Sequence, residues 1–221
     1  TINTTGAVTA SGAIGTDIGT LTITNSGGTT FSGAVSAAAV AITSTTLNNA
    51  VTFNGDLSLT TGLTVGAGSA AYNVAINGGT NSIAGTTTFA NTGTVTLGNG
   101  GDTTAFTGGV IVTAPSSVTV NGTVSAAGAG VITLGDSGTG VSVTGDSTVG
   151  GTSTGQITFG AITISDGKTL TVGAGASTPI SMTTVSGVLN GNPSYLTINT
   201  TGAVTASGAI GTDIGTLTIT N

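Results

Sequence analysis

The chain has 221 residues and a net charge of −6, and its amino-acid composition is unusually narrow. It holds one Lys, seven Asp, no Cys and no His, so that 4% of its residues are charged, against about a quarter in a typical soluble domain. Without Cys and His the usual zinc ligands are missing, and an acidic chain with one Lys cannot neutralise nucleic-acid phosphates. This composition is typical of external fibres and adhesins, and it predicts an extracellular or cell-surface protein.

A perfect internal repeat organises the chain. Residues 1–25, TINTTGAVTASGAIGTDIGTLTITN, recur without a substitution as residues 197–221. Residues 1–196 therefore form one tandem-repeat unit, and residues 197–221 begin the next, identical unit. Because the chain starts with Thr and begins and ends inside the same unit, we expect it to be an excerpt of a longer, processed polypeptide.

Short runs in which apolar residues stand two apart predict half-buried β-strands along the whole chain. Gly, Thr, Ser, Asn and Val dominate, while Glu and Arg are absent, so long helices are not expected. Turn sequences such as SGG, NGD, GNGG and NGNP separate the runs. In chain order the apolar positions are Leu21/Ile23, Val40/Ile42, Val51/Phe53, Leu57/Leu59, Leu63/Val65, Tyr72/Val74/Ile76, Val95/Leu97, Val110/Val112, Val118/Val120, Ile132/Leu134, Val141/Val143, Ile157/Phe159, Ile162/Ile164, Leu170/Val172, Ile180/Met182 and Leu196/Ile198.

A second, weaker period predicts the architecture. Similar strand openings recur along the unit, at Leu21, Leu63, Val95, Leu170 and Leu196. Their spacing suits the coils of a β-solenoid, and we expect roughly 19–25 residues per coil and about nine coils per unit. The alternative is a string of β-sandwich domains of about 100 residues each, for which an aromatic anchor and Pro-rich linkers would be expected. The absence of Trp and the presence of only three Pro favour the solenoid.

The coil sequences resemble a known group of proteins. Segments such as LTITNSGGTTFSGAVSAAAVAIT and FGAITISDGKTLTVGAGA look like the repetitive β-solenoid regions of bacterial autotransporters and filamentous-haemagglutinin-like surface adhesins. The resemblance covers the whole chain and is one of composition and coil pattern. It implies a right-handed parallel β-helix and a surface role.

Two serine motifs resemble those of hydrolases. Gly135–Gly138 reads GDSG, as around the nucleophile of chymotrypsin-like proteases, and Gly151–Gly155 reads GTSTG, a match to G-x-S-x-G. Both chemistries need a general base that is normally His, and the chain has none. We therefore interpret both motifs as turns, predict no catalytic or cofactor-binding residues, and expect that the protein is not an enzyme.

The acidic residues are candidates for calcium binding. Most of them adjoin Gly, and they are Asp17, Asp56, Asp102, Asp136, Asp146, Asp166 and Asp213. Residues 135–143, GDSGTGVSV, approach the calcium nonapeptide G-G-x-G-x-D-x-U-x, but Gly140 stands where the ligand Asp should be. We favour Asp as a turn cap, with Lys168 likewise flanking a turn, and predict no metal ligand; a calcium-stabilised repeat is a minor alternative.

Thr-x-Thr runs raise the further alternative of an ice-binding Thr face. They occur at Thr20/Thr22/Thr24, Thr94/Thr96, Thr169/Thr171 and Thr216/Thr218/Thr220. Because the runs do not recur once per coil, outward Thr on ordinary strands is the preferred interpretation.

The expected function is that of a structural repeat in an extracellular fibre, with units stacked end to end into a long, stiff solenoid. The expected partners are identical units in the same chain and, through lateral self-association, other copies, with no nucleic acid and no membrane span in this segment. The alternative function is a stalk that presents an adhesin's binding domain located elsewhere in the polypeptide.

Overall fold

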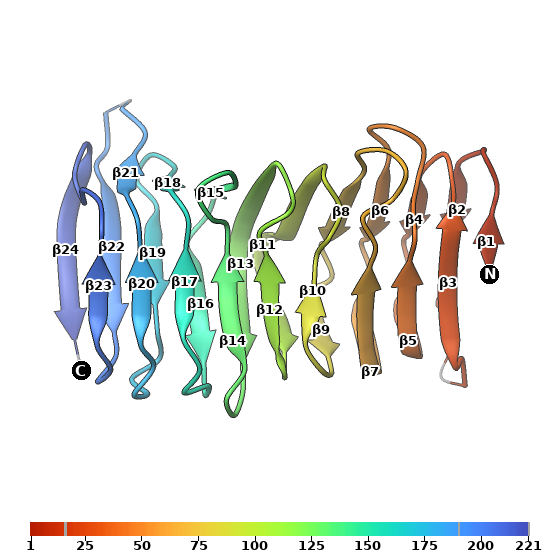
Figure 1. The fold of residues 1–221 in the computed structure, drawn as a ribbon, viewed down its shortest axis with the longest axis horizontal. Helices are drawn as coiled ribbons and strands as arrows, with labels where there is room; N and C mark the ends of the chain where they lie inside the picture. The colour runs from red at the N-terminus through yellow and green to blue at the C-terminus, as the bar shows by residue number, and fades with distance from the viewer. Residues whose placement is uncertain (16, 190, 221) are drawn as a thin grey trace.

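The computed structural model describes residues 1–15, 17–189 and 191–220, which form a β-solenoid of about nine turns (Figure 1). Each strand pairs in parallel with a strand one coil further along the chain. Among these residues there is no α-helix, and hence none long and apolar enough to cross a bilayer. The predicted solenoid is confirmed. The β-sandwich alternative is wrong, because its sheets would be antiparallel.

The strands stack into three faces that run along the solenoid. In the first face, Ile2 pairs with Ile23, Ile23 pairs with Ile42, and a bridge from Val65 to Phe89 carries the column on. Most strands of this face are labelled at the front of Figure 1. In stacking order they are β1 (Ile2–Asn3), β3 (Thr20–Asn25), the second half of β5 (Val35–Ile42), the second half of β7 (Leu57–Val65), β10 (Thr87–Thr88), β12 (Gly109–Val112), β14 (Val131–Leu134), β17 (Ile157–Phe159), β20 (Ile180–Met182) and β23 (Val204–Ala206).

The second face begins where Val8 pairs with Thr29, and it ends where Val185 forms a bridge to Ile210. Its strands are β2 (Val8–Ala10), β4 (Thr29–Phe31), β6 (Ala50–Phe53), β8 (Asn73–Ile76), the first part of β11 (Thr94–Phe106), the first part of β13 (Ser117–Ala126), β15 (Gly140–Val143), β18 (Ile162–Ile164) and β21 (Val185–Gly187).

The third face begins with a bridge from Ile14 to Val35. It then uses the first parts of β5 and β7, because these long strands bend round a corner and serve two faces. The remaining strands are β9 (Thr80–Ile83), the second parts of β11 and β13, β16 (Ser147–Gly151), β19 (Thr169–Val172), β22 (Ser194–Asn199) and β24 (Ile214–Thr220).

The coil length varies little along the stack. Paired residues are 19 apart at the shortest coil, from Leu21 to Val40, and 26 apart at the longest, from Leu170 to Leu196. The predicted range is confirmed except for this longest coil, which exceeds it by one residue. Relative to the coil before it, this coil gains its extra residues between β21 and β22. Four strand pairs, among them β11 with β13, also change register along their length.

The core is filled by roughly one side chain in two along most strands inside the stack. In β13 burial alternates without a break over its whole length, which places Val118, Val120 and Val124 inside. Burying a side chain of this size contributes roughly 1.5–3 kcal/mol, and stacking repeats the gain in every coil. Aromatic rings stack in the same way, with the centroids of Phe31 and Phe53 lying 5.0 Å apart.

Glycines line one corner where successive coils come too close for a side chain. A Cβ atom added to Gly55 would lie 2.3 Å from the carbonyl carbon of Gly33, and one on Gly78 would lie 2.6 Å from the carbonyl oxygen of Gly55. Gly12 begins this column, and a Cβ there would meet nothing within 4 Å. Gly is therefore required inside the stack and is optional at its start.

Buried hydroxyls satisfy the backbone at another corner. The Oγ of Ser153 donates to the carbonyl oxygen of Gly130 (2.6 Å), the Oγ1 of Thr178 donates to the carbonyl of Ser153, and the Oγ1 of Thr200 donates to the carbonyl of Thr178 (2.6 Å). All three donor residues are buried. Each bond joins a coil to the one before it, so the ladder satisfies carbonyl groups that would otherwise be buried without a donor.

Candidate functional site

The serine of the GDSG sequence lies in an exposed turn between β14 and β15. Beside it, the carboxylate Oδ1 of Asp136 accepts the backbone N–H groups of Gly138 (2.7 Å) and Thr139 (3.0 Å). These bonds form an Asx-type turn. The predicted turn is confirmed, and Asp136 is its cap.

Ser153, the central residue of the GTSTG sequence, is only 3% exposed. Its Oγ donates to the carbonyl of Gly130 and accepts the N–H of Gly155 at 2.9 Å. A nucleophile must reach its substrate and a base, whereas this hydroxyl is enclosed and bonded to backbone on both sides. The sequence predicted a turn here, and the structure shows in addition that the turn is fixed to the preceding coil.

Three further Asp carboxylates cap turns of the next coil. Oδ1 of Asp56 accepts the N–H of Thr80, that of Asp146 accepts the N–H of Thr169, and that of Asp166 accepts the N–H of Asn192, each at 2.9 Å. Each bond joins neighbouring coils. The prediction of Asp as a turn cap is confirmed at these positions, and the partner lies one coil away, which sequence spacing did not indicate.

The calcium-like segment does not gather carboxylates. Asp136 lies at an exposed turn, while Asp102 is buried and accepts the N–H of Asn99 (2.7 Å) within the same strand, β11. Across residues 1–15, 17–189 and 191–220, no three His, Cys, Asp or Glu side chains form a group that could hold a metal ion. The backbone of Lys168 closes a turn, with its N–H donating to the carbonyl of Ser165 (3.0 Å).

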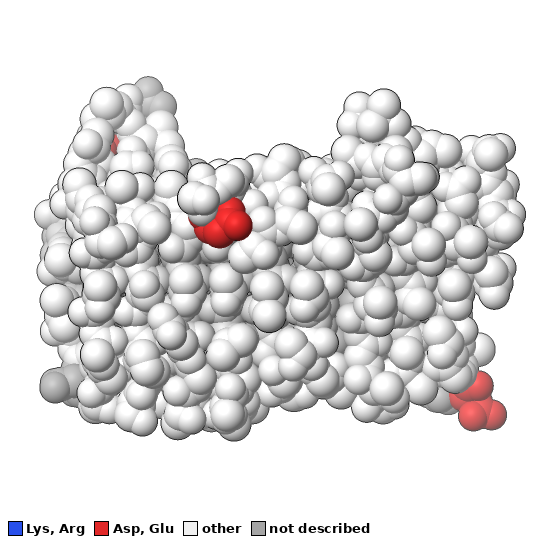
Figure 2. Space-filling model, viewed as in Figure 1, with Lys and Arg blue, Asp and Glu red and all other residues white. Residues whose placement is uncertain are grey.

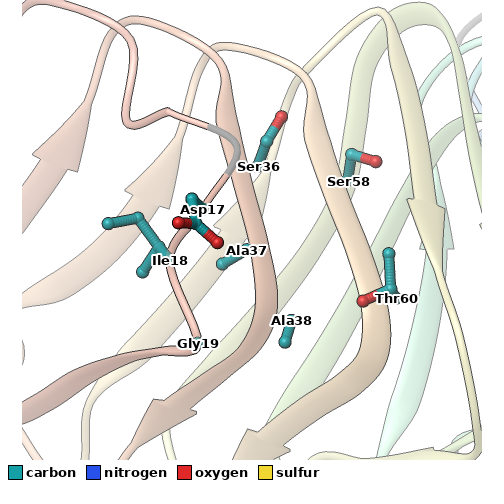
Figure 3. Close-up of a pocket in the computed structure, with 8 residues that line it drawn as sticks. All are labelled: Asp17, Ile18, Gly19, Ser36, Ala37, Ala38, Ser58 and Thr60. Carbon is teal, nitrogen blue, oxygen red and sulfur yellow. The ribbon is translucent and has the colours of Figure 1, made fainter.

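An open hollow lies between the turn at residues 17–19 and the first parts of β5 and β7 (Figure 3). Its polar lining consists of the Asp17 carboxylate and the hydroxyls of Ser36, Ser58 and Thr60. The hollow therefore offers a single carboxylate, whereas general acid and base work commonly pairs two titratable groups.

A column of outward hydroxyls runs along each face, in agreement with the interpretation of outward Thr on ordinary strands. The Thr-x-Thr runs do not recur in every coil, but a single outward Thr or Ser recurs in nearly all of them. On the third face the paired residues are Thr80, Thr103, Thr123, Thr148, Thr171, Thr197 and Thr218. On the second they are Thr9, Thr30, Thr52, Ala75, Thr96, Thr119, Ser142, Thr163 and Ser186, and at the end of the first they are Thr88, Ile111, Thr133, Thr158, Ser181 and Thr205.

The first face carries almost no charge. Figure 2, which views the molecule from the same side as Figure 1, shows no basic atoms on this side and acidic atoms in only a few places. Hydroxyls, small apolar groups and backbone therefore make up most of this surface.

The two copies of the repeated segment lie in different environments. In the first copy, Leu21 is 9% exposed and Ile23 is fully buried, because β5 covers β3. In the second copy, the equivalent Leu217 and Ile219 are 43% and 65% exposed, since β24 is the last strand of the stack. The last strand, β24, therefore exposes apolar residues that are covered by the next coil in the first copy of the same sequence.

Comparison with protein-family models, with curated proteins and with solved structures finds no match to this chain. The resemblance to autotransporter and haemagglutinin-like adhesins therefore remains a prediction.

Proposed function

We propose that this chain is a non-catalytic structural repeat of an extracellular fibre, in which successive units, each equivalent to residues 1–196, continue one solenoid into a long, stiff filament. The observation that carries the proposal is the contrast between Ile23 and Ile219, which are equivalent residues of the repeat. Ile23 is buried beneath the coil that follows it, and Ile219, which is 65% exposed, is the same residue of the repeat and can receive the same coil from a further unit.

The pairing across the unit boundary supports the same proposal. Ile198 pairs with Ile219, just as the equivalent Ile2 pairs with Ile23. The second copy therefore already has the register that it needs to receive the coil that follows the first. An open strand edge of this kind attracts another strand, and a tandem unit supplies the one that fits.

Lateral association of such filaments is part of the proposal. Two rods that face each other across the weakly charged first face have little charge to repel one another, and their hydroxyl columns share the strand spacing of about 4.8 Å. Bundles of these rods should be insensitive to salt, whereas strictly single rods at all salt concentrations would argue against lateral association.

The experiment is electron microscopy of a chain that carries three complete units. We expect uniform rods that lengthen by about 42 Å for each added unit, from nearly nine coils at about 4.8 Å each. Flexible beads would overturn the proposal. Ile219→Asp should break the rod at the unit boundary, while the matched control Thr218→Asp, on the outward side of the same strand, should leave it continuous.

A second candidate is the stalk of an adhesin whose binding domain lies elsewhere in the polypeptide. The same rod would serve both functions, so the full polypeptide separates them: a stalk protein should bind cells or glycans while its purified repeats do not, whereas a purely structural fibre should bind through neither. The outward hydroxyl columns also keep the ice-binding alternative open, and thermal hysteresis of the purified repeats tests it directly.

A further inference from the structure

We infer that each repeat unit ends one-third of a turn out of phase with its start, so that equivalent surfaces of successive units point in three directions about 120° apart and return to the same side at every third unit. The inference rests on the proposed continuation of one solenoid through successive units. It concerns the surface that the rod presents to its neighbours.

The first observation is that the two copies of the repeat lie on different faces. Ile2 begins the first face, where it pairs with Ile23. Its equivalent, Ile198, lies in the third face, between Val172 of β19 and Ile219 of β24. A unit with a whole number of coils would have returned this residue to the first face.

The other two parts of the repeated segment have shifted in the same sense. Val8 lies in the second face opposite Thr29, whereas its equivalent, Val204, lies in the first face opposite Ile180. Ile14 lies in the third face, whereas its equivalent, Ile210, lies in the second, in a bridge to Val185. All three strand positions have thus stepped back by one face, as a rigid rotation of the coil requires.

The strand count gives the same result. From β1 to β21 the chain passes eight complete coils of three strand positions and two positions of a ninth, before β22 begins the next unit. Two-thirds of a final coil leave the next unit one-third of a turn short. With strands about 4.8 Å apart, one unit advances the rod by about 42 Å, and three units advance it by about 125 Å.

The three faces are alike enough to accept this exchange. Val204 pairs with Ile180 in the first face, and its equivalent, Val8, pairs with Thr29 in the second face. Both pairings are possible because each face offers an inward column of buried side chains. The outward columns also continue through the boundary. Thr205 stands beside Ser181, and its equivalent, Thr9, stands beside Thr30, so a hydroxyl on one side is followed by a hydroxyl on the other.

The consequence concerns the partner, which is another copy of the same rod. The weakly charged first face is presented once on each of the three sides in every three units, so no side of the rod is adhesive along its whole length. Each rod can therefore contact neighbours in three directions, and the arrangement favours round bundles over flat ribbons.

Labels on a three-unit chain test the inference, and the absence of native Cys makes single-site labelling clean. In one series, Ser142→Cys is placed in every unit. In the second, Ser142→Cys is placed in the first unit, Ser82→Cys in the second and Thr64→Cys in the third. These three exposed residues come from the second, third and first faces, respectively. Each chain is coupled to maleimide-gold and imaged by tomography.

We expect the equivalent positions of the first series to carry gold on three sides of the rod, and the compensated positions of the second series to carry it along one side. Any intrinsic twist of the solenoid acts on both series equally and cancels in the comparison. The reverse pattern on intact rods would overturn the inference and leave the proposed function standing. Chains without a continuous rod would overturn both.

Discussion

Ile23 and Ile219 allow one substitution to be tested in two environments, because they are the same residue of the repeat. Ile23 is fully buried between β1 and β5, whereas Ile219 is 65% exposed on the last strand. Truncation of a buried Ile to Ala costs about 2–5 kcal/mol, while surface substitutions usually stay within about 0.5 kcal/mol. We therefore expect Ile23→Ala to lower the free energy of unfolding by at least about 2 kcal/mol and Ile219→Ala to leave it nearly unchanged.

The assay is equilibrium unfolding in urea, combined with hydrogen exchange of the strand amides, because a repeat protein can unfold from its ends. The decisive measurement follows extension of the chain beyond Asn221 by a copy of residues 26–46, which supplies the covering coil. The cost of Ile219→Ala should then rise toward that of Ile23→Ala. If it stays near zero in the extended chain, the added coil does not dock on β24 and the reasoning is refuted.

Three further substitutions probe the stack. Ser153→Ala should lower the free energy of unfolding by about 1–3 kcal/mol, because it leaves buried backbone groups unpaired. The control Ser137→Ala should leave the free energy of unfolding unchanged, and equal effects of the two substitutions in chemical unfolding would contradict the ladder. Gly55→Ala should destabilise by about 1–3 kcal/mol through its clash with backbone, and the matched Gly12→Ala should not; similar melting temperatures for both would show that the corner can open. Burial raises the pKa of Tyr72, whose hydroxyl donates to the carbonyl of Gly66 at 2.6 Å. The folded state therefore disfavours the phenolate form. The free energy of unfolding should fall as the pH rises above about 10, where the tyrosine of the unfolded chain ionises. Urea midpoints between about pH 8 and 11.5 should decline less steeply for Tyr72→Phe than for the unchanged chain, and parallel declines would refute this.

The sequence predicted the strands well because burial follows a period of two. Val118 and Val120 are buried in β13, and Ile162 and Ile164 are buried in β18, where the alternation of apolar residues placed them. The coil length could also be predicted from the similar strand openings at Leu170 and Leu196, which pair with each other one turn apart, although the openings at Leu63 and Val95 lie on different faces. These features are local and recur in every coil, so each coil gives independent sequence evidence for them.

The lateral order of the structure could not be predicted in the same way. The Thr-x-Thr runs at Thr94/Thr96 and Thr169/Thr171 belong to different faces, and the column that aligns Thr171 with Thr148 and Thr197 depends on the register between coils. Variation in the length of the coils hides this register in the sequence. The one-third step depends on the same register. The number of coils in a unit is the length of the unit divided by the coil length. Because the coil length varies, the sequence does not distinguish a whole number of coils from a fractional one.

The buried ladder of Ser153, Thr178 and Thr200 has a direction. Each hydroxyl donates to a carbonyl in the coil that precedes it in the chain, and each carbonyl belongs to a segment made earlier. A coil that is synthesised last therefore meets acceptors that are already in place. The ladder hydroxyl of the new coil is satisfied as soon as the coil docks, so the solenoid can be extended coil by coil from its N-terminal end, with the finished coil acting as the template for the next.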